Sequence, residues 1–332
     1  MNNFWIKNSA PLFALAPMED VTDTVFREIV MSVAAPERLH IIYTEFTNVD
    51  GMNHPIGRER VGERLIVNDS EVNWSQKLNI KLVAQVWGKD PEIFHKVVKE
   101  ISDDGRFDGI DINMGCPVRN VVKNGCCSAL IGIPELAREI VFATKEATDL
   151  PVSVKTRTGL SKHVTESWME SLLGTKPAAI ILHGRTQKQQ SEGMADWEQI
   201  GLGAQIRNEQ SPSTAFLGNG DVMTYDEGLE KCRKYKLDGV MIGRGIFQNP
   251  WFFAADDLHE RNLDERISLL VRHAELYQRT WEGKKNFNIL KRFFKIYASN
   301  FSGASTLRQA LMQTNNLEDV QQVIAKFLRE VA

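Results

Sequence analysis

Short apolar and β-branched segments recur along the first 245 residues of the chain, and each one ends in a polar or glycine-containing cluster. Segments of this length, bounded in this way, are typical of buried β-strands. The pattern predicts eight strands. They are Leu12–Pro17, Leu39–Phe46, Lys81–Trp87, Phe107–Asn113, Pro151–Lys155, Ala179–His183, Thr214–Asn219 and Gly239–Gly243.

Amphipathic patterns with helical spacing lie between most of these strands. They are Thr22–Val33, Pro91–Ile101, Pro134–Ala147, Thr165–Leu173, Trp197–Arg207 and Thr224–Tyr235. Asp90 followed by Pro91 is a typical helix start, whereas the segment between the second and third strands gives no clear pattern. Strands that alternate with helices predict parallel βαβ units, and eight units over about 240 residues match a (β/α)8 TIM barrel. A doubly wound open sheet is the alternative.

The strand pattern stops near residue 250, and residues 252–332 read as helices only. We therefore expect a TIM-barrel domain over residues 1–250 and an all-helical domain over residues 251–332. Within Lys284–Ser299, apolar residues recur at helical spacing, and lysines lie along a different face. The apolar residues are Phe287, Leu290, Phe294 and Tyr297.

Charge is unevenly distributed in this helical part. The whole chain has 40 basic and 43 acidic residues, a net charge of −3, which by itself gives no sign of nucleic-acid binding. Between Glu282 and Glu318, however, there is no acidic residue and there are six basic ones. They are Lys284, Lys285, Lys291, Arg292, Lys295 and Arg308. A solvated helix face would explain them, but the missing acidic residues favour contact with phosphates.

Composition excludes several classes of protein. With 42% hydrophobic and 25% charged residues, the chain is typical of globular proteins. No stretch approaches the roughly 18 apolar residues of a membrane span, and Met1–Lys7 does not begin a leader peptide, so we expect a cytoplasmic protein. Four irregularly spaced cysteines predict reduced thiols rather than a disulfide framework, and no metal site.

The residues that close the predicted strands are unusually polar. In a TIM barrel these positions converge on one cavity, which holds the active site. They are Pro17 to Asp20, Thr44 and Glu45, Gln85, Asn113 to Cys116, Lys155 and Arg157, His183 and Arg185, Asn219 to Asp221, and Gly243 and Arg244. Each of them taken alone has a structural explanation, such as capping a loop, but together they predict a functional site.

The last two strand ends carry Gly218–Asp221 and Gly243–Gly245, whose glycines let backbone N–H groups approach an anion. Arg244 adds a charge-assisted donor for a phosphate, although tight turns alone would also explain the glycines. Met223 stands where a dinucleotide-binding G-x-G-x-x-G would need its third glycine, so a single phosphate fits better. Among one-phosphate cofactors of barrels, FMN suits Gln85, which can pair with the polar edge of the ring, and Lys155, which can stabilise negative charge on the reduced ring.

Several motifs occur in a fixed order along the chain. They are APMEDVTD at Ala16–Asp23, DINMGCP at Asp111–Pro117, KTRTG at Lys155–Gly159, HGRT at His183–Thr186, GNGD at Gly218–Asp221 and IGRG at Ile242–Gly245. In this combination the chain resembles the tRNA-dihydrouridine synthases over nearly its whole length. The last two motifs are shared with other flavin and phosphate barrels. The N-x-G-C-P and H-G-R-T motifs in combination are the ones that are specific to this family.

The resemblance implies an FMN enzyme that uses NADPH to reduce the C5=C6 bond of uridines in tRNA, and that acts as a monomer. The implied FMN contacts are Pro17, Met18, Glu19, Gln85, Lys155, Asn219, Gly220, Asp221, Gly243 and Arg244. The implied uracil or tRNA contacts are Asn113, His183 and Arg185, and we add Lys284, Lys291, Arg292 and Lys295 of the basic segment. The resemblance designates Cys116 as the acid that protonates C5 while hydride from flavin N5 adds to C6. The target base must unstack to enter the barrel.

A cysteine that donates a proton must remain a thiol at working pH, near or above its usual pKa of about 8.5. We expect Cys126, Cys127 and Cys232 to be buried apolar cysteines. The chain departs from the family pattern at two places. Ser191 stands where many members carry tyrosine, and Cys127 stands where many carry the second glycine of G-x-G.

Two other functions remain open at this stage. One is an FMN barrel that reduces a free pyrimidine, similar to dihydroorotate or dihydropyrimidine dehydrogenases, which would not need the basic helical segment. The other is an RNA-binding or chaperone-like protein that keeps the fold without activity. The sequence does not say which uridine position of tRNA would be modified.

Overall fold

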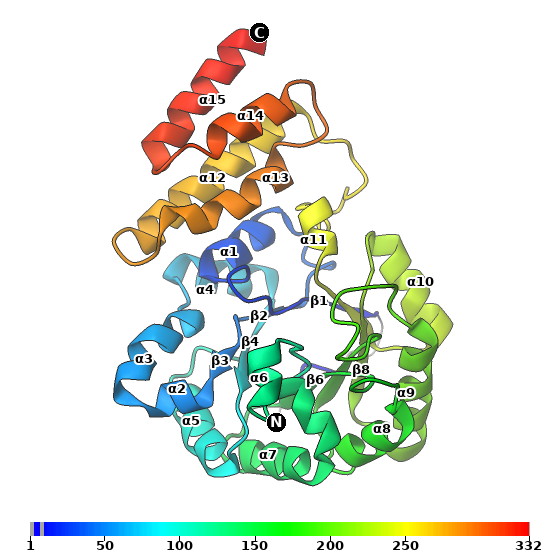
Figure 1. Ribbon diagram of the computed structural model, residues 1–332. Coiled ribbons are helices and arrows are strands. Elements are labelled where there is room, and N and C mark those ends of the chain that lie inside the picture. Colours follow the sequence, from blue (N-terminus) through cyan, green and yellow to red (C-terminus); the bar gives the residue numbers. More distant parts are fainter. Residues whose placement is uncertain (1–2, 7–9, 332) are drawn as a thin grey trace.

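The computed structural model describes residues 3–6 and 10–331, and its centre is a closed barrel of parallel strands (Figure 1). Met1, Asn2 and Lys7 of the stretch Met1–Lys7, from which the sequence predicted no leader peptide, therefore lie outside the described residues. The strands are β1 Leu12–Leu15, β2 Ile41–Tyr43, β3 Thr47–Asn48, β4 Lys81–Trp87, β5 Gly109–Met114, β6 Val152–Arg157, β7 Ala179–His183, β8 Ala215–Asn219 and β9 Gly239–Ile242. The barrel closes because β1 pairs with both β2 and β9, and β2 pairs with β4.

One barrel position is filled by two short strands, β2 and β3, which both pair with β4. The prediction of one continuous strand over Leu39–Phe46 was therefore wrong in its detail. After Tyr43 the chain leaves the regular ladder, because the Thr44 hydroxyl donates to the Glu45 carbonyl at 2.8 Å and accepts from the Gln85 N–H at 3.1 Å. This irregularity places the buried Glu45 carboxylate toward the loop after β1.

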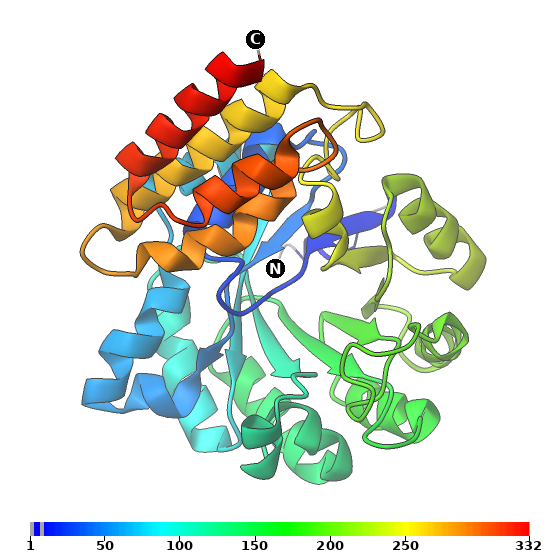
Figure 2. The same ribbon diagram turned by 45° about the horizontal axis from the view of Figure 1, so that its top comes forward.

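Helices follow the strands and surround the barrel (Figures 1 and 2). The α-helices are α1 Thr24–Val33, α2 Val49–Asn53, α3 Pro55–Gly62, α4 Asp69–Leu78, α5 Pro91–Asp103, α6 Arg119–Lys123, α7 Pro134–Glu146, α8 Thr165–Leu173, α9 Trp197–Gln210, α10 Tyr225–Tyr235 and α11 Gly245–Gln248, with 3-10 helices η1 Glu63–Leu65 and η2 Cys127–Gly132. Several starts follow the sequence signals: the Asp90 carboxylate caps α5, with Pro91 in its first turn. The predicted TIM barrel is confirmed. The segment without a clear pattern contains α2 to α4.

The hydrophobic core has two parts, as the alternation of side chains along barrel strands requires. A small cluster fills the inside of the barrel. It includes Trp5, Leu12, Tyr43, Leu217 and Met241. A much larger cluster lies between the strands and the surrounding helices, and it continues without interruption into the C-terminal helices.

The helical part consists of α12 Leu263–Trp281, η3 Phe287–Phe293, α13 Phe294–Tyr297, α14 Ala304–Leu311 and α15 Leu317–Val331. It lies beside α1 and α4, over one side of the barrel (Figure 2). Phe26 of α1 packs against Phe293 with ring centroids 5.0 Å apart, and the Trp281 indole N–H donates to the Asp23 carboxylate at 2.7 Å. The expected helical end is thus confirmed, while its division from the barrel at residue 250 stays a prediction. In the described chain, every helix is too short or too polar to span a membrane.

The segment Lys284–Ser299 differs from the single amphipathic helix that its spacing suggested. Its first half is the 3-10 helix η3, begun by the Asn286 side chain, which accepts from the Asn288 N–H, and only the last turn, α13, is α-helical. Lys284 precedes both helices. The segment does not form one amphipathic helix because it is buried on more than one side: four of the five residues at positions 293–297 are buried. They are Phe293, Phe294, Ile296 and Tyr297.

A buried ion pair joins α1 to α4. The Arg27 Nε and the Glu71 carboxylate lie 2.5 Å apart, and both side chains are fully buried. Arg27 also donates to the carbonyls of Thr22 and Ile66, and Glu71 accepts from the Thr24 hydroxyl. All the polar groups of the pair are therefore satisfied, which is the condition under which a buried pair is tolerated.

Glu71→Gln should lower the free energy of unfolding by about 3–5 kcal/mol, because it leaves the buried Arg27 guanidinium without a counter-charge. Urea unfolding monitored by circular dichroism measures the change. The matched control is Glu100→Gln, which breaks the exposed Arg58–Glu100 pair and should cost about 1 kcal/mol or less. Equal effects in the two variants would show that Arg27–Glu71 is not the connection that holds α4 on α1.

Candidate active site

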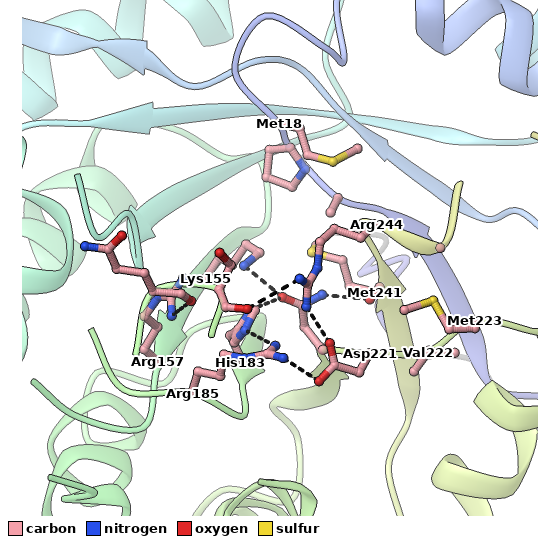
Figure 3. A pocket seen from close by; sticks show the side chains of 18 residues that line it. Met18, Lys155, Arg157, His183, Arg185, Asp221, Val222, Met223, Met241 and Arg244 are labelled. Atoms are coloured by element: carbon pink, nitrogen blue, oxygen red, sulfur yellow. Dashed lines mark hydrogen bonds and ion pairs between the residues drawn. The ribbon is translucent and has the colours of Figure 1, made fainter. Parts of the chain in front are cut away.

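A cavity of about 210 Å³ opens at the carboxyl ends of the barrel strands (Figure 3). In that view Met18 lies across the cavity from His183 and Arg185, and Asp221 lies beside these two, joined by dashed lines to Arg185 and Arg244. The lining residues are Ala16, Pro17, Met18, Lys155, Arg157, His183, Arg185, Gln190, Ser191, Asn219, Gly220, Asp221, Val222, Met223, Met241, Gly243, Arg244 and Gly245. Eight of the ten predicted FMN contacts therefore line a common cavity, and Glu19 and Gln85 do not.

The loops after β8 and β9 form a backbone cradle at one side of this cavity. Gly220 has φ +129°, and a β-carbon there would lie 2.6 Å from the Ala195 β-carbon, so only glycine fits. Asp221 follows with φ +52°. Gly243 faces open space, with the Ala16 β-carbon at 3.8 Å as the nearest atom to an added β-carbon. Within the described chain, the N–H groups of Gly243 and Arg244 donate to no backbone or side-chain acceptor, so the cradle offers donors to an anion.

Asp221 holds the two arginines of the cavity. Its carboxylate lies 2.5 Å from Arg185 Nη2 and 2.5 Å from Arg244 Nη2, and it accepts from the Ala195 N–H at 2.7 Å. Burial raises the pKa of Asp221, but the hydrogen bonds from Arg185 and Ala195 outweigh it and lower the pKa. Arg185 is buried and has protein acceptors for four of its five N–H donors, whereas the Arg244 side chain is 52% exposed and can turn toward a ligand.

Asn219 connects Lys155 and His183 in the floor of the cavity. Its Nδ2 donates to the Met241 carbonyl at 2.8 Å, which leaves Oδ1 to accept from Lys155 Nζ at 3.1 Å and from His183 Nδ1 at 2.8 Å. Arg185 donates to His183 Nε2 at 3.2 Å, so the imidazole carries its proton on Nδ1. Desolvation and the nearby Lys155 and Arg157 hold the pKa of His183 well below its usual value, and the ring is neutral. Burial also lowers the pKa of Lys155, to about 8.

A line of buried hydrogen bonds runs behind the cavity from Asp111 to the Cys116 loop. Asp111 accepts from the Ser153 hydroxyl at 2.5 Å and from Gln85 Nε2 at 2.6 Å. Gln85 Oε1 accepts from Asn113 Nδ2 at 3.0 Å, and Asn113 Oδ1 accepts from the N–H groups of Gly115 and Cys116, each at 3.0 Å. Burial raises the pKa of Asp111 to about 6.

Cys116 lies at the end of this line and is partly exposed. Arg157, which lines the cavity, donates to the Gly115 carbonyl at 2.7 Å and so holds the loop beside the cavity. A hydrogen bond with the Cys127 thiol lowers the pKa of Cys116 to about 7, against the effect of burial. This is below the range expected above for a cysteine that must stay a thiol.

The predicted site residues fall into five groups. Most line the cavity, but Gln85 and Asn113 lie in the line behind it, and Cys116 lies at the rim. Glu19 points away and pairs with Arg64 at 2.9 Å. The basic residues belong to η3, α13 and the turn before them, where Arg292 donates to the Asp20 carbonyl at 3.0 Å.

Two residues that matter here were named from the sequence but were given no role at the site. Arg157, one of the strand-end residues, also donates to the carbonyls of Thr186 and Gln190, and so joins the loops after β5 and β7 to the end of β6. Its position two residues after Lys155 on β6 was the available signal, because both side chains then share a face of the strand. Cys127 was expected to be an apolar cysteine. It is buried, but its thiol contacts Cys116.

Asp111→Asn should weaken the chain of hydrogen bonds that runs from Asp111 to Cys116, because the new amide places an NH2 donor against one of the two groups that donate to Asp111, Ser153 Oγ or Gln85 Nε2. We expect a loss of about 1–3 kcal/mol of unfolding free energy and faster hydrogen exchange at Gly115 and Cys116. Urea unfolding and exchange followed by mass spectrometry measure the two effects. Asp108→Asn is the control, because the Asp108 carboxylate accepts from the Leu82 N–H but is 35% exposed and can use water. Unchanged exchange at Gly115 and Cys116 would contradict the role of Asp111.

Comparison with known proteins agrees with this geometry. Residues 14–332 match a family model described as dihydrouridine synthase (Dus). A probable tRNA-dihydrouridine synthase of Staphylococcus epidermidis is 41% identical over 327 residues, which are 98% of this chain and 96% of that protein. Probable tRNA-dihydrouridine synthase 2 of Bacillus subtilis is 40% identical over 331 residues, which are 99% of this chain and 97% of that protein.

Among solved structures, histamine dehydrogenase from Rhizobium sp. 4-9 superposes with a TM-score of 0.54 at 12% identity, over 80% of this chain and 48% of that one. That likeness shows the barrel fold alone. The family match over nearly the whole chain and the two bacterial relatives go further: this chain belongs to the dihydrouridine synthase family.

Proposed function

We propose that this chain is a tRNA-dihydrouridine synthase, an oxidoreductase that reduces uridines of tRNA to 5,6-dihydrouridine with FMN and NADPH. The observation that supports this reaction is the membership of the chain in the dihydrouridine synthase family. The barrel domain of residues 1–250 holds the flavin, and the helical domain of residues 251–332 binds tRNA. The enzyme acts as a monomer in the cytoplasm, where tRNA is modified.

The residues of the cavity suit a flavin with one phosphate. The cradle of Gly220, Gly243 and Arg244 offers backbone N–H groups and an exposed guanidinium, which together match a phosphate. Lys155 stands on β6, in the floor of the cavity, where its charge would stabilise a reduced ring. Pro17 and Met18 also line the cavity, and Met18 lies on its opposite side (Figure 3). When bound and reduced, the flavin supplies hydride to C6 of the uracil.

The remaining steps belong to the residues of the chain. Cys116 holds the proton that C5 needs, and Asn113 keeps its loop in place through the N–H groups of Gly115 and Cys116. His183 is neutral, with its proton directed at Asn219, so it does not compete as an acid. His183 and Arg185 form the wall next to the phosphate cradle and would face the uracil or its neighbours.

Cys116→Ala tests this assignment directly. The variant should bind FMN and be reduced by NADPH as the parent protein is, yet lose nearly all uridine reduction, since only the proton donor is removed. Stopped-flow absorbance of the flavin separates the two half-reactions. Turnover of unmodified tRNA near the parent rate would remove Cys116 from the role of acid, and NADPH oxidation driven by free uracil or dihydroorotate instead of tRNA would favour the free-pyrimidine function.

The pH dependence of turnover follows from the pKa of Cys116. Only the thiol can donate a proton, so the rate should fall as pH rises through the Cys116 pKa of about 7. In Cys127→Gly the hydrogen bond that lowers this pKa is absent, and the falling limb should move toward the usual thiol pKa of about 8.5. Rate profiles over pH for both proteins give the comparison. A falling limb at the same pH in both proteins would show that Cys127 does not determine the pKa of the proton donor.

The basic segment of the helical end contacts the loop after β1, whose residues Pro17 and Met18 line the cavity. Arg292 donates to the Asp20 carbonyl, and Lys285 lies 3.8 Å from the buried Glu45 carboxylate. Lys284 and Lys295 are exposed, and Lys291 is partly exposed. Because the cavity lies at the neighbouring strand ends, a tRNA held by these cations would have a nucleotide within reach of the barrel mouth.

Replacing Lys284, Lys291 and Lys295 together with Glu should weaken tRNA binding strongly while FMN content stays constant, because the barrel is unchanged. With Ala at the same positions, the salt dependence of binding should flatten by about 0.7–0.9 of a log unit per lost phosphate contact. The control carries Glu at Lys96, Lys99 and Lys234, which has the same charge change on the outer helices α5 and α10. Equal tRNA affinity in both triple variants would show that tRNA binds elsewhere.

A further inference from the structure

Two of the four cysteines face each other at the rim of the barrel. Cys116 is partly exposed and follows β5, and Cys127 is fully buried at the start of η2. Their thiols share a hydrogen bond. Cys126 has a different neighbour, because its thiol donates to the Asn124 carbonyl at 3.8 Å, and Cys232 lies on α10.

The backbone holds Cys127 in this position. Its φ is +53°, in the left-handed region that L residues rarely adopt. The next residue, Ser128, donates to the Cys116 carbonyl with its hydroxyl at 2.8 Å and with its N–H at 3.4 Å. The two loops are therefore fastened together directly beside the pair of thiols, so the pairing does not depend on a mobile segment.

The two sulfurs are unequal in their chemistry. Burial and the neighbouring Cys116 raise the pKa of Cys127 well above its usual value, so Cys127 remains a thiol and donates the shared hydrogen bond. The same bond lowers the pKa of Cys116 to about 7 and favours its thiolate. A partly exposed thiolate beside a buried thiol is the arrangement of an oxidisable cysteine with a resolving partner.

We propose that Cys116 and Cys127 form a dithiol that hydrogen peroxide oxidises to a disulfide, with Cys116 as the attacking residue and Cys127 as the resolving one. The Cys116 thiolate attacks one peroxide oxygen, the O–O bond breaks, and hydroxide leaves, so Cys116 becomes a sulfenic acid. The Cys127 sulfur then displaces the sulfenic hydroxyl, its proton leaves with that group as water, and the S–S bond forms. Two thiols and one peroxide give one disulfide and two waters.

The oxidation has a consequence for turnover, and this part rests on the proposed role of Cys116 as acid. The disulfide removes the proton from Cys116, so uridine reduction stops until a thiol reductant restores the pair. It also keeps Cys116 from proceeding to sulfinic acid, which thiols do not reverse. Cys127 thus makes the loss of activity reversible.

The test uses the flavin-loaded protein after removal of reductant. Hydrogen peroxide is added, remaining thiols are alkylated, and peptides are mapped by mass spectrometry, while tRNA reduction is measured before and after dithiothreitol. The parent protein should give a peptide that joins Cys116 to Cys127 and should recover most of its own untreated rate. Cys127→Gly, which suits the backbone at φ +53°, should give sulfinic acid at Cys116 with no recovery.

Two further proteins keep the test decisive. Cys127→Ser retains a polar side chain and should behave as Cys127→Gly, whereas Cys126→Ser, which changes the adjacent buried cysteine, should behave as the parent. A Cys116–Cys126 link, sulfinic acid at Cys116 in the parent, or recovery in Cys127→Gly would each overturn the proposal. The peptide map does not depend on tRNA, so a disulfide found in a protein without synthase activity would separate this inference from the proposed function.

Discussion

The buried carboxylate of Asp111 determines the direction of the hydrogen bonds behind the active site. An ionised carboxylate can only accept, so Gln85 must turn its amide N–H toward it and its carbonyl toward Asn113. Asn113 must then present its own carbonyl to the N–H groups of Gly115 and Cys116. Each amide has a donor end and an acceptor end, so fixing one end fixes the next. The pKa of about 6 leaves Asp111 ionised at neutral pH, which maintains this direction.

The same logic operates on the other side of the cavity, with a backbone carbonyl as the fixed acceptor. Met241 accepts from Asn219, which turns the Asn219 carbonyl toward Lys155 and His183. His183 must therefore donate from Nδ1 and accept on Nε2. Both walls of the site are oriented from acceptors deep in the barrel rather than from its exposed loops, which explains how a polar cavity can be preorganised without a metal or disulfide among the described residues.

The strand ends of the barrel were predictable, because strand periodicity and the geometry of parallel barrels together place closing residues around one cavity. Lys155, His183, Asn219 and Arg244 all line it. Which polar residues face the cavity and which stand behind it was not predictable, because that depends on hydrogen-bond partners from other strands, as for Gln85. The division of the second strand depends on the Thr44 side chain for the same reason. In Lys284–Ser299 the spacing was helical, but packing against α1 buried more than one face and favoured a 3-10 turn.

The loop after β1 connects the cavity to the helical end. Its Met18 N–H donates to the Thr22 hydroxyl at 2.8 Å, its Asp20 N–H donates to the buried Glu45 carboxylate at 2.6 Å, and its Asp20 carbonyl accepts from Arg292. Pro17 and Met18 on this loop also form a wall of the cavity. The basic residues of the helical end are therefore not equivalent. Lys284 and Lys295 are exposed, whereas Arg292 donates to the Asp20 carbonyl and lies 3.7 Å from the Asp20 carboxylate, so a ligand that drew Arg292 away would release one restraint on the loop that carries Pro17 and Met18. If the basic segment binds tRNA as proposed, that binding and the position of the cavity wall would be coupled through Arg292.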